Sequence, residues 1–310
     1  MSGGTVPEVP VVSQAPYVKA GGVGGVPNEY VHLRRTNAVL ITGWDRLDDG
    51  EFLLTARWPA PPEGLPYDPR VLVQTIRQSG LAIAHAEYGV PLSHQTLLNS
   101  FDFTVAPGLQ IPSSTESCPL TVKVALTKQR RRGRAGSSLG LDIRILRDDA
   151  MVARADCQFG WISPVAYRRL RGDHLTAEWA TWSLPEPVAP CTVGRTRDAD
   201  VVLAPGGRRH QWQLRNDVDN VLLFDHPVDH VPGLVLMEAA YQAAHATLYP
   251  ASLEATTVTT SFERYTEFDR PCWIEAEVVP PTACGELSVK VTGTQDGNTV
   301  FRGRLSGQRA

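Results

Sequence analysis

Residues 225–240 hold the side chains best suited to chemistry, in the order Asp-His-Pro-Val-Asp-His-Val-Pro-Gly-Leu-Val-Leu-Met-Glu-Ala-Ala. The imidazoles of His226 and His230 lie at the front of this segment, and a His side chain can take and return a proton near neutral pH. Each follows an acid, Asp225 or Asp229, that can orient an imidazole or cap a helix. A solvated turn before an ordinary core helix would also account for both pairs.

Glu238 is the residue of this segment that an ordinary core helix does not explain. The Pro232-Gly233 pair opens an apolar helical run, and Glu238 lies within that run. A carboxylate there is costly to bury without a purpose, and desolvation is expected to raise its pKa toward the range of a general base. The alternative is a structural carboxylate that pairs with an Arg and fastens the two halves of the protein together.

An earlier segment combines an apolar helical face with a second charged residue. Asp68-Pro69 is a helix start, and a stop follows near residues 89–91. The apolar face between them consists of Val71, Ile76, Leu81, Ile83 and Ala84. Arg77 lies among these residues, so we expect its guanidinium to be buried and to need an anionic partner. Gln74 and Gln78 flank it and can orient polar groups, but they cannot act as bases.

Three pairs of similar segments indicate that the chain contains two copies of one unit. They occur in the same order at offsets of 161 to 164 residues, and are 31–41 with 193–203, 74–78 with 238–242, and 100–104 with 261–265. In each half a strand or two, including 52–58 and 211–215, precedes one helix. The second helix is predicted from Gly233 to near Pro250.

Long strands separated by turn signals follow each helix. They are predicted at residues 120–128, 140–147 and 151–162 in the first half and at 257–262, 272–279, 286–292 and 299–305 in the second. One helix followed by an antiparallel meander is an α+β pattern, and a central apolar helix wrapped by such a sheet is the hotdog arrangement. We therefore predict a tandem (double) hotdog.

Length and composition agree with two domains. The 310 residues correspond to about two domains of ordinary size, and 42% apolar residues are enough for two cores. The predicted parts are a disordered lead-in at 1–28, an N-terminal hotdog domain at 29–171, a linker at 172–190 and a C-terminal hotdog domain at 191–310. Trp179 and Trp182 are expected to pin the linker to the body.

Net charge and cysteine content exclude some classes of function. A net charge of -3 gives no reason to expect a nucleic-acid partner. Five scattered Cys residues in a long chain favour reduced thiols, which indicates a cytoplasmic protein. We expect no membrane span, no metal and no cofactor, because the sequence lacks a long apolar run, metal-ligand spacing and a nucleotide-binding loop.

Two motifs together make the chain resemble the A-factor biosynthesis (AfsA-type) proteins, which make precursors of γ-butyrolactone signals. The first is Thr75-Ile76-Arg77-Gln78 with Gly89-Val90-Pro91, and the second is residues 224–233, Phe-Asp-His-Pro-Val-Asp-His-Val-Pro-Gly. The resemblance covers residues 31–307. The second motif is also similar to the His-containing Pro-Gly turn of hydroxyacyl-carrier-protein dehydratases, themselves hotdog proteins, but it is one residue shorter.

The resemblance implies an acyltransferase. Such an enzyme moves a β-ketoacyl group from an acyl-carrier-protein thioester to the hydroxyl of dihydroxyacetone phosphate. The ester can then close to a butenolide phosphate, a precursor of butyrolactone, butenolide or furan-type signals. The implied partners are therefore the acyl carrier protein and dihydroxyacetone phosphate, and pairing of two chains into a homodimer is left open.

The chain departs from the family at the two central helices. Family members usually carry a Glu-x-x-Arg pair on each, whereas here the first helix has Gln74 and Arg77 and the second has Glu238 and Tyr241. Each half has kept one member of the pair. We therefore predict one composite site that uses Glu238 and Arg77 across the two halves, the alternative being reduced catalytic power.

Acyl transfer to an alcohol needs a base, oxyanion donors and a cation for the acceptor's phosphate. Glu238 is the first candidate base, and His226 and His230 are the alternatives. Backbone amides at the helix start near Gly233 are the expected oxyanion donors, and Arg77 is expected to bind either the phosphate or Glu238.

Further residues are assigned to substrate binding. They are Gln74, Gln78, Asp225, Asp229, Gly233 and Tyr241. Two of them have a favoured structural alternative, because Asp229 precedes a helix that it can cap and Tyr241 can simply pack in the core.

A dense basic run between two predicted strands contains Arg130, Arg131, Arg132 and Arg134. A solvated hairpin tip is the ordinary interpretation of such a run. Acyl carrier proteins are acidic, so a carrier-protein docking patch is the alternative.

Two other functions stay open. The dehydratase-like turn favours a hotdog thioester hydratase, dehydratase or thioesterase. Gln74 and Tyr241, which break the family pattern, favour a non-catalytic double hotdog that binds an acyl chain. Consumption of a β-ketoacyl thioester that depends on dihydroxyacetone phosphate selects the acyltransferase, and turnover with water alone selects the hydrolase.

Overall fold

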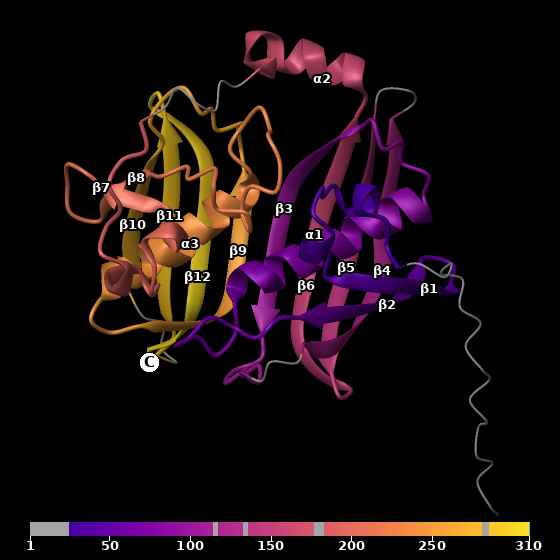
Figure 1. Cartoon of the computed structure of the whole chain (residues 1–310), viewed down its shortest axis with the longest axis horizontal. Coiled ribbons are helices and arrows are strands. Elements are labelled where there is room, and N and C mark those ends of the chain that lie inside the picture. The colour runs from indigo at the N-terminus through magenta and orange to yellow at the C-terminus, as the bar shows by residue number, and fades with distance from the viewer. Residues whose placement is uncertain (1–24, 114–116, 133–135, 177–182, 281–284, 310) are drawn as a thin grey trace, which may run out of the picture.

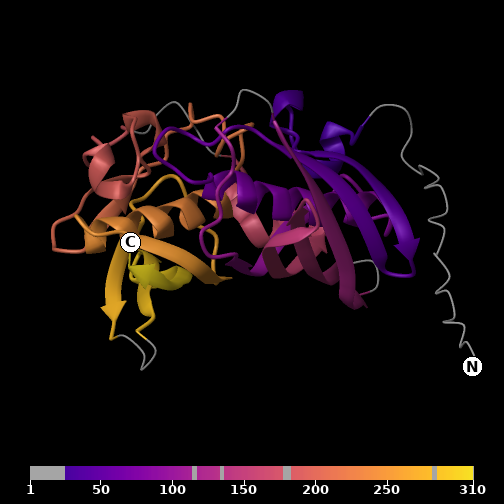
Figure 2. The ribbon, with the colours of Figure 1, turned by 90° about the horizontal axis from the view of Figure 1, so that it is seen from below.

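The computed structural model describes residues 25–113, 117–132, 136–176, 183–280 and 285–309. Within these residues, twelve strands form one continuous antiparallel sheet in the order β1-β2-β4-β5-β6-β3-β9-β12-β11-β10-β8-β7 (Figure 1). The two halves lie side by side, each with its long helix enclosed by its own strands (Figures 1 and 2).

The first half follows the order strand, strand, helix and four strands. Its elements are β1 (Ile41–Asp48), β2 (Glu51–Trp58), α1 (Pro69–Ala86), β3 (Gln95–Val105), β4 (Cys118–Arg132), β5 (Gly136–Arg147) and β6 (Ala150–Ile162). Two short 3-10 helices, η1 (Asn28–Val31) and η2 (Thr36–Ala38), precede it. Helix α2 (Pro164–Arg171) and the 3-10 helix η3 (Gly172–Leu175) then lead toward the second half.

The second half repeats this order, which confirms the predicted tandem hotdog. Its elements are η4 (Pro190–Val193), η5 (Asp198–Asp200), β7 (Leu203–Pro205), β8 (Gln211–Leu214), α3 (Gly233–Leu248), β9 (Leu253–Phe262), β10 (Trp273–Val279), β11 (Leu287–Gln295) and β12 (Asn298–Arg309). The predicted strands and both predicted central helices are therefore present, with ends that differ by a few residues.

The two halves meet at strands β3 and β9, which pair antiparallel. Ser100 lies directly opposite Ser261, and Thr104 lies opposite Thr257. Ser100 and Ser261 are also equivalent positions of the internal repeat. In an antiparallel pair of equivalent strands, equivalent residues face each other only where a two-fold axis passes between them. The halves are therefore related by an approximate two-fold axis near this pair.

Each central helix is held to its half by one buried glutamine. The side-chain oxygen of Gln78 accepts hydrogen bonds from the backbone N–H groups of Leu40 and Ile41, and its nitrogen donates to the Ala38 carbonyl. Gln242, its repeat equivalent, does the same with Val202 and Asp200. These bonds satisfy backbone groups in the segment before the first strand of each half. Gln78 therefore has a structural role, and its role in substrate binding stays a prediction.

Strands β1, β3 and β7 and helix α2 were not predicted, and for β3 and α2 the reason is local. Strand β3 carries a bulge between Leu98 and Ser100, so its apolar residues do not alternate regularly. Helix α2 has only eight residues, too few to show a helical apolar period. Neither pattern stands out in the sequence, although β3 joins the halves and α2 contacts the loop before α3.

Parts of the predicted domain organisation fall on residues that the structure does not describe. Residues 1–24 of the lead-in, and Trp179 and Trp182 of the linker, lie outside the described residues. Val26 is buried and Asn28 begins η1, so residues 26 and 28, which the prediction put in the lead-in, belong to the folded part of the chain. No helix in the described residues is both long enough and apolar enough to cross a bilayer.

Candidate functional site

A cavity lies between the N-terminal turns of α1 and α3, close to the approximate two-fold axis. Arg70, Val73 and Gln74 line it from α1, and Met237, Glu238 and Tyr241 line it from α3; Leu222 and Leu223 also border it. Val73 is equivalent to Met237 and Gln74 to Glu238 in the repeat. The structure thus brings Gln74, Glu238 and Tyr241 together at the boundary of the halves.

Glu238 is paired with Arg195, and not with Arg77, for which Glu238 was one of two predicted partners. The Nε and Nη2 atoms of Arg195 donate to the two oxygens of Glu238, each at 2.7 Å. Gln242 Nε2 also donates to Glu238 Oε1, at 2.6 Å. Glu238 is 2% exposed and Arg195 9% exposed, so this is a buried, two-pronged ion pair. The structural alternative for Glu238 is met in part: the carboxylate pairs with an Arg, but Arg195 belongs to the same half, so this pair does not fasten the two halves together.

A second buried ion pair next to it joins the two halves. Arg70 donates from Nη1 to Asp200 at 2.6 Å and from Nη2 to Asp68 at 2.9 Å. Asp68 also accepts from the backbone N–H of Arg70 and caps α1 at its predicted start. Asp200 lies in η5 of the other half and binds Arg197 as well. The start of α1 is therefore tied to the second half by charge-assisted hydrogen bonds.

Arg77 belongs to a different cluster, further along α1. Its Nη1 donates to the Val31 carbonyl at 3.2 Å, the one hydrogen bond of this guanidinium to the described residues. Burial lowers the pKa of Arg77 to about 10, and the charge of Asp225 opposes that shift. The side chain nevertheless keeps part of its surface open to solvent. Arg77 is thus a charged, partly exposed guanidinium with one hydrogen bond to the described residues.

Two histidines beside Arg77 stay neutral. His32 Nε2 and His85 Nε2 are 2.8 Å apart, and His85 Nδ1 lies 2.7 Å from the Val90 carbonyl. A carbonyl can only accept, so His85 Nδ1 carries a proton and His32 Nε2 donates to His85. Burial, followed by the charge of Arg77, lowers the pKa of His32 to about 3. This pair therefore adds no positive charge beside Arg77 at neutral pH.

The Asp225-His226 pair lies on the second half and contacts this cluster of the first half. Asp225 accepts hydrogen bonds from the backbone N–H groups of Arg34 and Arg35, and its Oδ2 is 3.0 Å from His226 Nδ1. Burial alone would raise the pKa of Asp225, but these hydrogen bonds lower it below its ordinary value. The ionised Asp225 fixes a proton on His226 Nδ1, so Nε2 is free to accept one.

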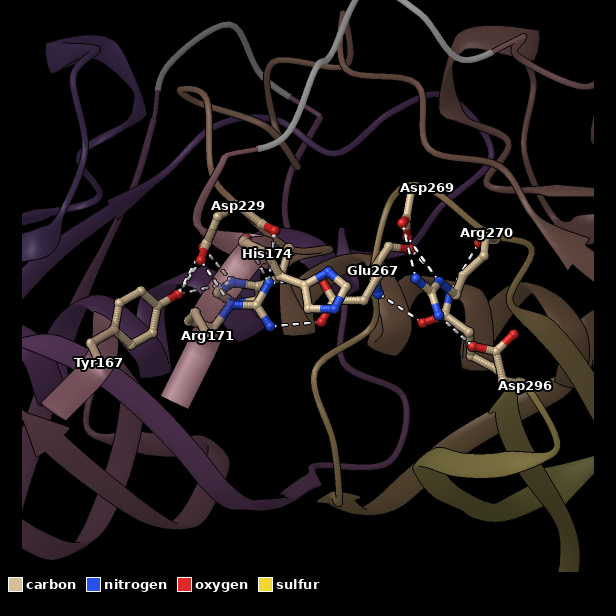
Figure 3. A network of polar contacts seen from close by, with 10 residues as sticks. Tyr167, Arg171, His174, Asp229, Glu267, Asp269, Arg270 and Asp296 are labelled. Atoms are coloured by element: carbon tan, nitrogen blue, oxygen red, sulfur yellow. Dashed lines mark hydrogen bonds and ion pairs between the residues drawn. The ribbon is translucent and has the colours of Figure 1, made fainter. Parts of the chain in front are cut away.

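Asp229 and His230 form a second Asp-His pair four residues further on. Asp229 accepts from the Tyr167 hydroxyl at 2.7 Å and from Arg171 Nε at 2.9 Å, and its Oδ1 lies 2.8 Å from His230 Nδ1 (Figure 3). Arg171 also binds both oxygens of Glu267 at 2.7 Å. The prediction that Asp229 caps α3 is wrong, because the N-cap is Pro232 and no side chain caps this helix.

Asp229 should make the stability of the protein depend on acidity. Burial opposes ionisation, but hydrogen bonds from His230, Tyr167 and Arg171 lower the pKa of Asp229 to about 2. Because the pKa is lower in the folded state, Asp229 contributes to the free energy of unfolding. This contribution is fully present above pH ~5 and is lost as the pH falls toward ~2. We expect Asp229→Asn to lower the free energy of unfolding by about 2 kcal/mol or more at pH 7, and the loss to shrink in acid.

Urea denaturation at several pH values measures this difference. The matched control is Asp173→Asn, because Asp173 is exposed and should change the free energy of unfolding by less than about 0.5 kcal/mol. A difference between wild type and Asp229→Asn that does not change with pH would contradict the assignment.

Gly233 begins α3 in a position that has no room for a side chain. A Cβ atom would lie 2.9 Å from a ring carbon of Phe262 and 3.5 Å from Leu98 Cδ2. We expect Gly233→Ala to lower the free energy of unfolding by about 1–3 kcal/mol in urea denaturation. Gly207→Ala is the control, because nothing lies within 4 Å of a Cβ there. Equal midpoints for the two variants would contradict this packing.

The other predicted site residues lie in different parts of the molecule. Gln74 Nε2 contacts the Leu222 carbonyl at 3.4 Å, and its Oε1 is buried without a partner among the described residues. Tyr241 interacts with Tyr67, and burial raises the pKa of its hydroxyl well above the ordinary value. Arg130 is exposed at the end of β4, which also contains Arg131 and Arg132, and Arg134 lies outside the described residues.

Sequence reasoning missed the arginines that satisfy the buried acids. They are Arg70, Arg171 and Arg195. One signal was available for Arg195, because a carboxylate buried in an apolar helix requires a cation. Several arginines qualified equally by sequence, and only the path of the chain before β7 brings this one to α3.

The comparisons with known proteins agree with this architecture. A family model described as the A-factor biosynthesis hotdog domain matches residues 20–163 and 178–308. A 2-oxo-3-(phosphooxy)propyl 3-oxoalkanoate synthase of Streptomyces virginiae is 42% identical over 282 residues, which are 89% of this chain and 95% of that protein. The protein of the same name from Streptomyces coelicolor is 38% identical over 290 residues, 91% of each chain.

A solved structure shares the fold at low identity. The 12:0-ACP thioesterase from Umbellularia californica has a TM-score of 0.50 and 11% identity, covering 84% of this chain and 94% of that one. This likeness bears on the fold alone. The family match spans both halves, and the relatives align over nearly their whole length. The chain therefore belongs to the A-factor biosynthesis hotdog domain family.

Proposed function

We propose that this protein is an acyltransferase that makes a 2-oxo-3-(phosphooxy)propyl 3-oxoalkanoate. The observation that carries the proposal is the 42% identity to a synthase of that name across 95% of its length. The product is the ester of a 3-oxo acid with dihydroxyacetone phosphate. It forms when the hydroxyl oxygen of dihydroxyacetone phosphate bonds to the carbonyl carbon of a 3-oxoacyl thioester. The carbon–sulfur bond breaks, and the thiolate leaves with the proton given up by the hydroxyl.

His226 is the base that we propose for this step. Its Nδ1 is held by the ionised Asp225, and Nε2 has no hydrogen-bond partner among the described residues. Its side chain is 27% exposed, so a substrate can reach it, whereas Glu238 is 1% exposed. Both oxygens of Glu238 are already engaged by Arg195, which makes this carboxylate a poor base in the present arrangement. His226 can pass the proton to the departing thiolate.

Arg77 is the phosphate-binding group that we propose. It is positively charged at neutral pH and makes few hydrogen bonds, and a guanidinium matches the geometry of phosphate oxygens. Asp225 links the two roles, because it bonds to His226 and its charge acts on Arg77. Binding of the phosphate at Arg77 would therefore hold the acceptor hydroxyl within the neighbourhood of the base.

The start of α3 supplies the oxyanion donors in this proposal. No side chain caps the helix, so the N–H groups of Gly233 and Leu234 lack partners among the described residues. They lie at the positive end of the helix dipole, where a developing negative charge on the thioester carbonyl is stabilised.

The test is a reaction with and without the acceptor. The protein is incubated with a 3-oxoacyl thioester of acyl carrier protein, alone and with dihydroxyacetone phosphate, and the products are identified by mass spectrometry. The proposal requires a phosphorylated ester, or the butenolide phosphate formed from it by loss of water, that appears only with the acceptor. Equal thioester consumption without the acceptor would establish a thioesterase, and no consumption would favour an acyl-binding protein.

A further inference from the structure

Helix α2 presents cations and apolar groups together on its outer face. Arg168 and Arg169 are exposed, and neither forms an ion pair with a described residue. Val165 and Leu170 are 51% and 59% exposed, which makes them two of the most exposed large apolar residues of the described chain. Asp173, also exposed, is the acid that follows in η3. Such a mixture of unpaired guanidinium and apolar groups is typical of a surface that meets an acidic partner.

The inner face of α2 is fixed to the loop that carries the proposed base. Tyr167 and Arg171 are buried, and both bind Asp229 (Figure 3). Asp229 lies three residues after His226 in the same loop. Figure 1 shows α2 above the junction of the two halves, near strands β3 and β6. The outer face of α2 is therefore held at a defined position on the side of the molecule where the motif loop lies.

A third exposed arginine, Arg130, lies at the same end of the sheet. Strand register places Arg132 opposite Gly136, and Gly136 opposite Ile162, the last residue of β6. Helix α2 begins two residues after Ile162. The end of β4, where Arg130 is exposed, therefore lies level with the end of β6, from which the chain continues into α2.

We propose that the outer face of α2, together with the end of β4, is the docking surface for the acyl carrier protein. This inference rests on the proposed function, because the donor there is a thioester on an acidic carrier protein. Arg168, Arg169 and Arg130 pair with carrier carboxylates, and Val165 and Leu170 pack against the carrier's apolar side chains. Docking at this position delivers the thioester arm toward the loop of His226 while the carrier itself stays outside.

The first experiment measures binding without catalysis. Holo acyl carrier protein without an acyl group is titrated against wild type and the Arg168→Glu/Arg169→Glu variant by isothermal calorimetry. We expect the variant to bind at least about tenfold more weakly, and wild-type binding to weaken between about 0.05 M and about 0.5 M salt, because ion pairs are screened. The control is Arg208→Glu/Arg209→Glu, an exposed arginine pair in the turn between β7 and β8.

The second experiment separates docking from chemistry. The KM for the carrier-protein thioester should rise at least about tenfold in the α2 variant, while kcat and KM with a 3-oxoacyl pantetheine thioester stay at the wild-type value. Val165→Ser/Leu170→Ser should raise the same KM more modestly. An α2 variant that binds holo carrier like wild type, or that loses activity equally with both thioesters, overturns the docking proposal.

Failure of the docking proposal differs from failure of the proposed function. If wild type makes no ester with either thioester, the function is wrong, and the calorimetric comparison of the two arginine pairs still decides docking. If wild type makes the ester and the two pairs affect carrier binding equally, the function stands and docking at α2 is wrong.

Discussion

The His226→Asn variant should form the ester at least about 100-fold more slowly than wild type, because it lacks the base that takes the hydroxyl proton. Asn keeps a polar group next to Asp225 but cannot accept and return a proton at this position. The loss should be in kcat, with little change in the KM for dihydroxyacetone phosphate, since the phosphate is held by Arg77. Steady-state kinetics with product detection by mass spectrometry measure both constants.

Two comparison variants make this result specific. Arg77→Gln should raise the KM for dihydroxyacetone phosphate by at least about tenfold, which separates acceptor binding from proton transfer. His230→Asn alters the other Asp-His pair of the same loop, and its main effect should be on the free energy of unfolding, because His230 is hydrogen-bonded to Asp229 and packs edge-on against the Tyr265 ring. A His226→Asn variant with the wild-type kcat would remove His226 as the base.

The Glu238→Gln variant should lose about 3–5 kcal/mol of free energy of unfolding. It leaves Arg195, which is 9% exposed, as a buried cation without its anionic partner. The size of the effect reflects the desolvated charge left behind more than the net value of the ion pair. Urea denaturation measures the loss, and activity is assayed at a temperature where the variant is still folded.

A double variant tells a structural Glu238 from a catalytic one. Replacing both partners, as Glu238→Leu with Arg195→Met, removes both buried charges and should restore much of the lost stability. If Glu238 is structural, ester formation recovers together with folding. If Glu238 is the base, the double variant regains stability but stays inactive, and the assignment of the base to His226 would be wrong.

The fold follows from patterns that lie close together in the sequence. The helical apolar faces, the Asp68-Pro69 start, the Pro232-Gly233 start and the alternating strands are local signals, and each element forms where its pattern predicts it. The repeat offsets also predicted two copies. Strand β3 was missed, because its bulge between Leu98 and Ser100 breaks the alternation that would reveal it.

The candidate site was only partly predictable, because its contacts join residues that lie far apart in the sequence. The sequence by itself determined which groups needed partners: a carboxylate in the apolar run of α3, and a guanidinium on α1. The tertiary structure decided which residues are those partners. It pairs Glu238 with Arg195 and places Arg77 beside Asp225 and His32. Ion pairing depends on distance in space and on burial, and neither is encoded in the spacing of residues about 160 positions apart.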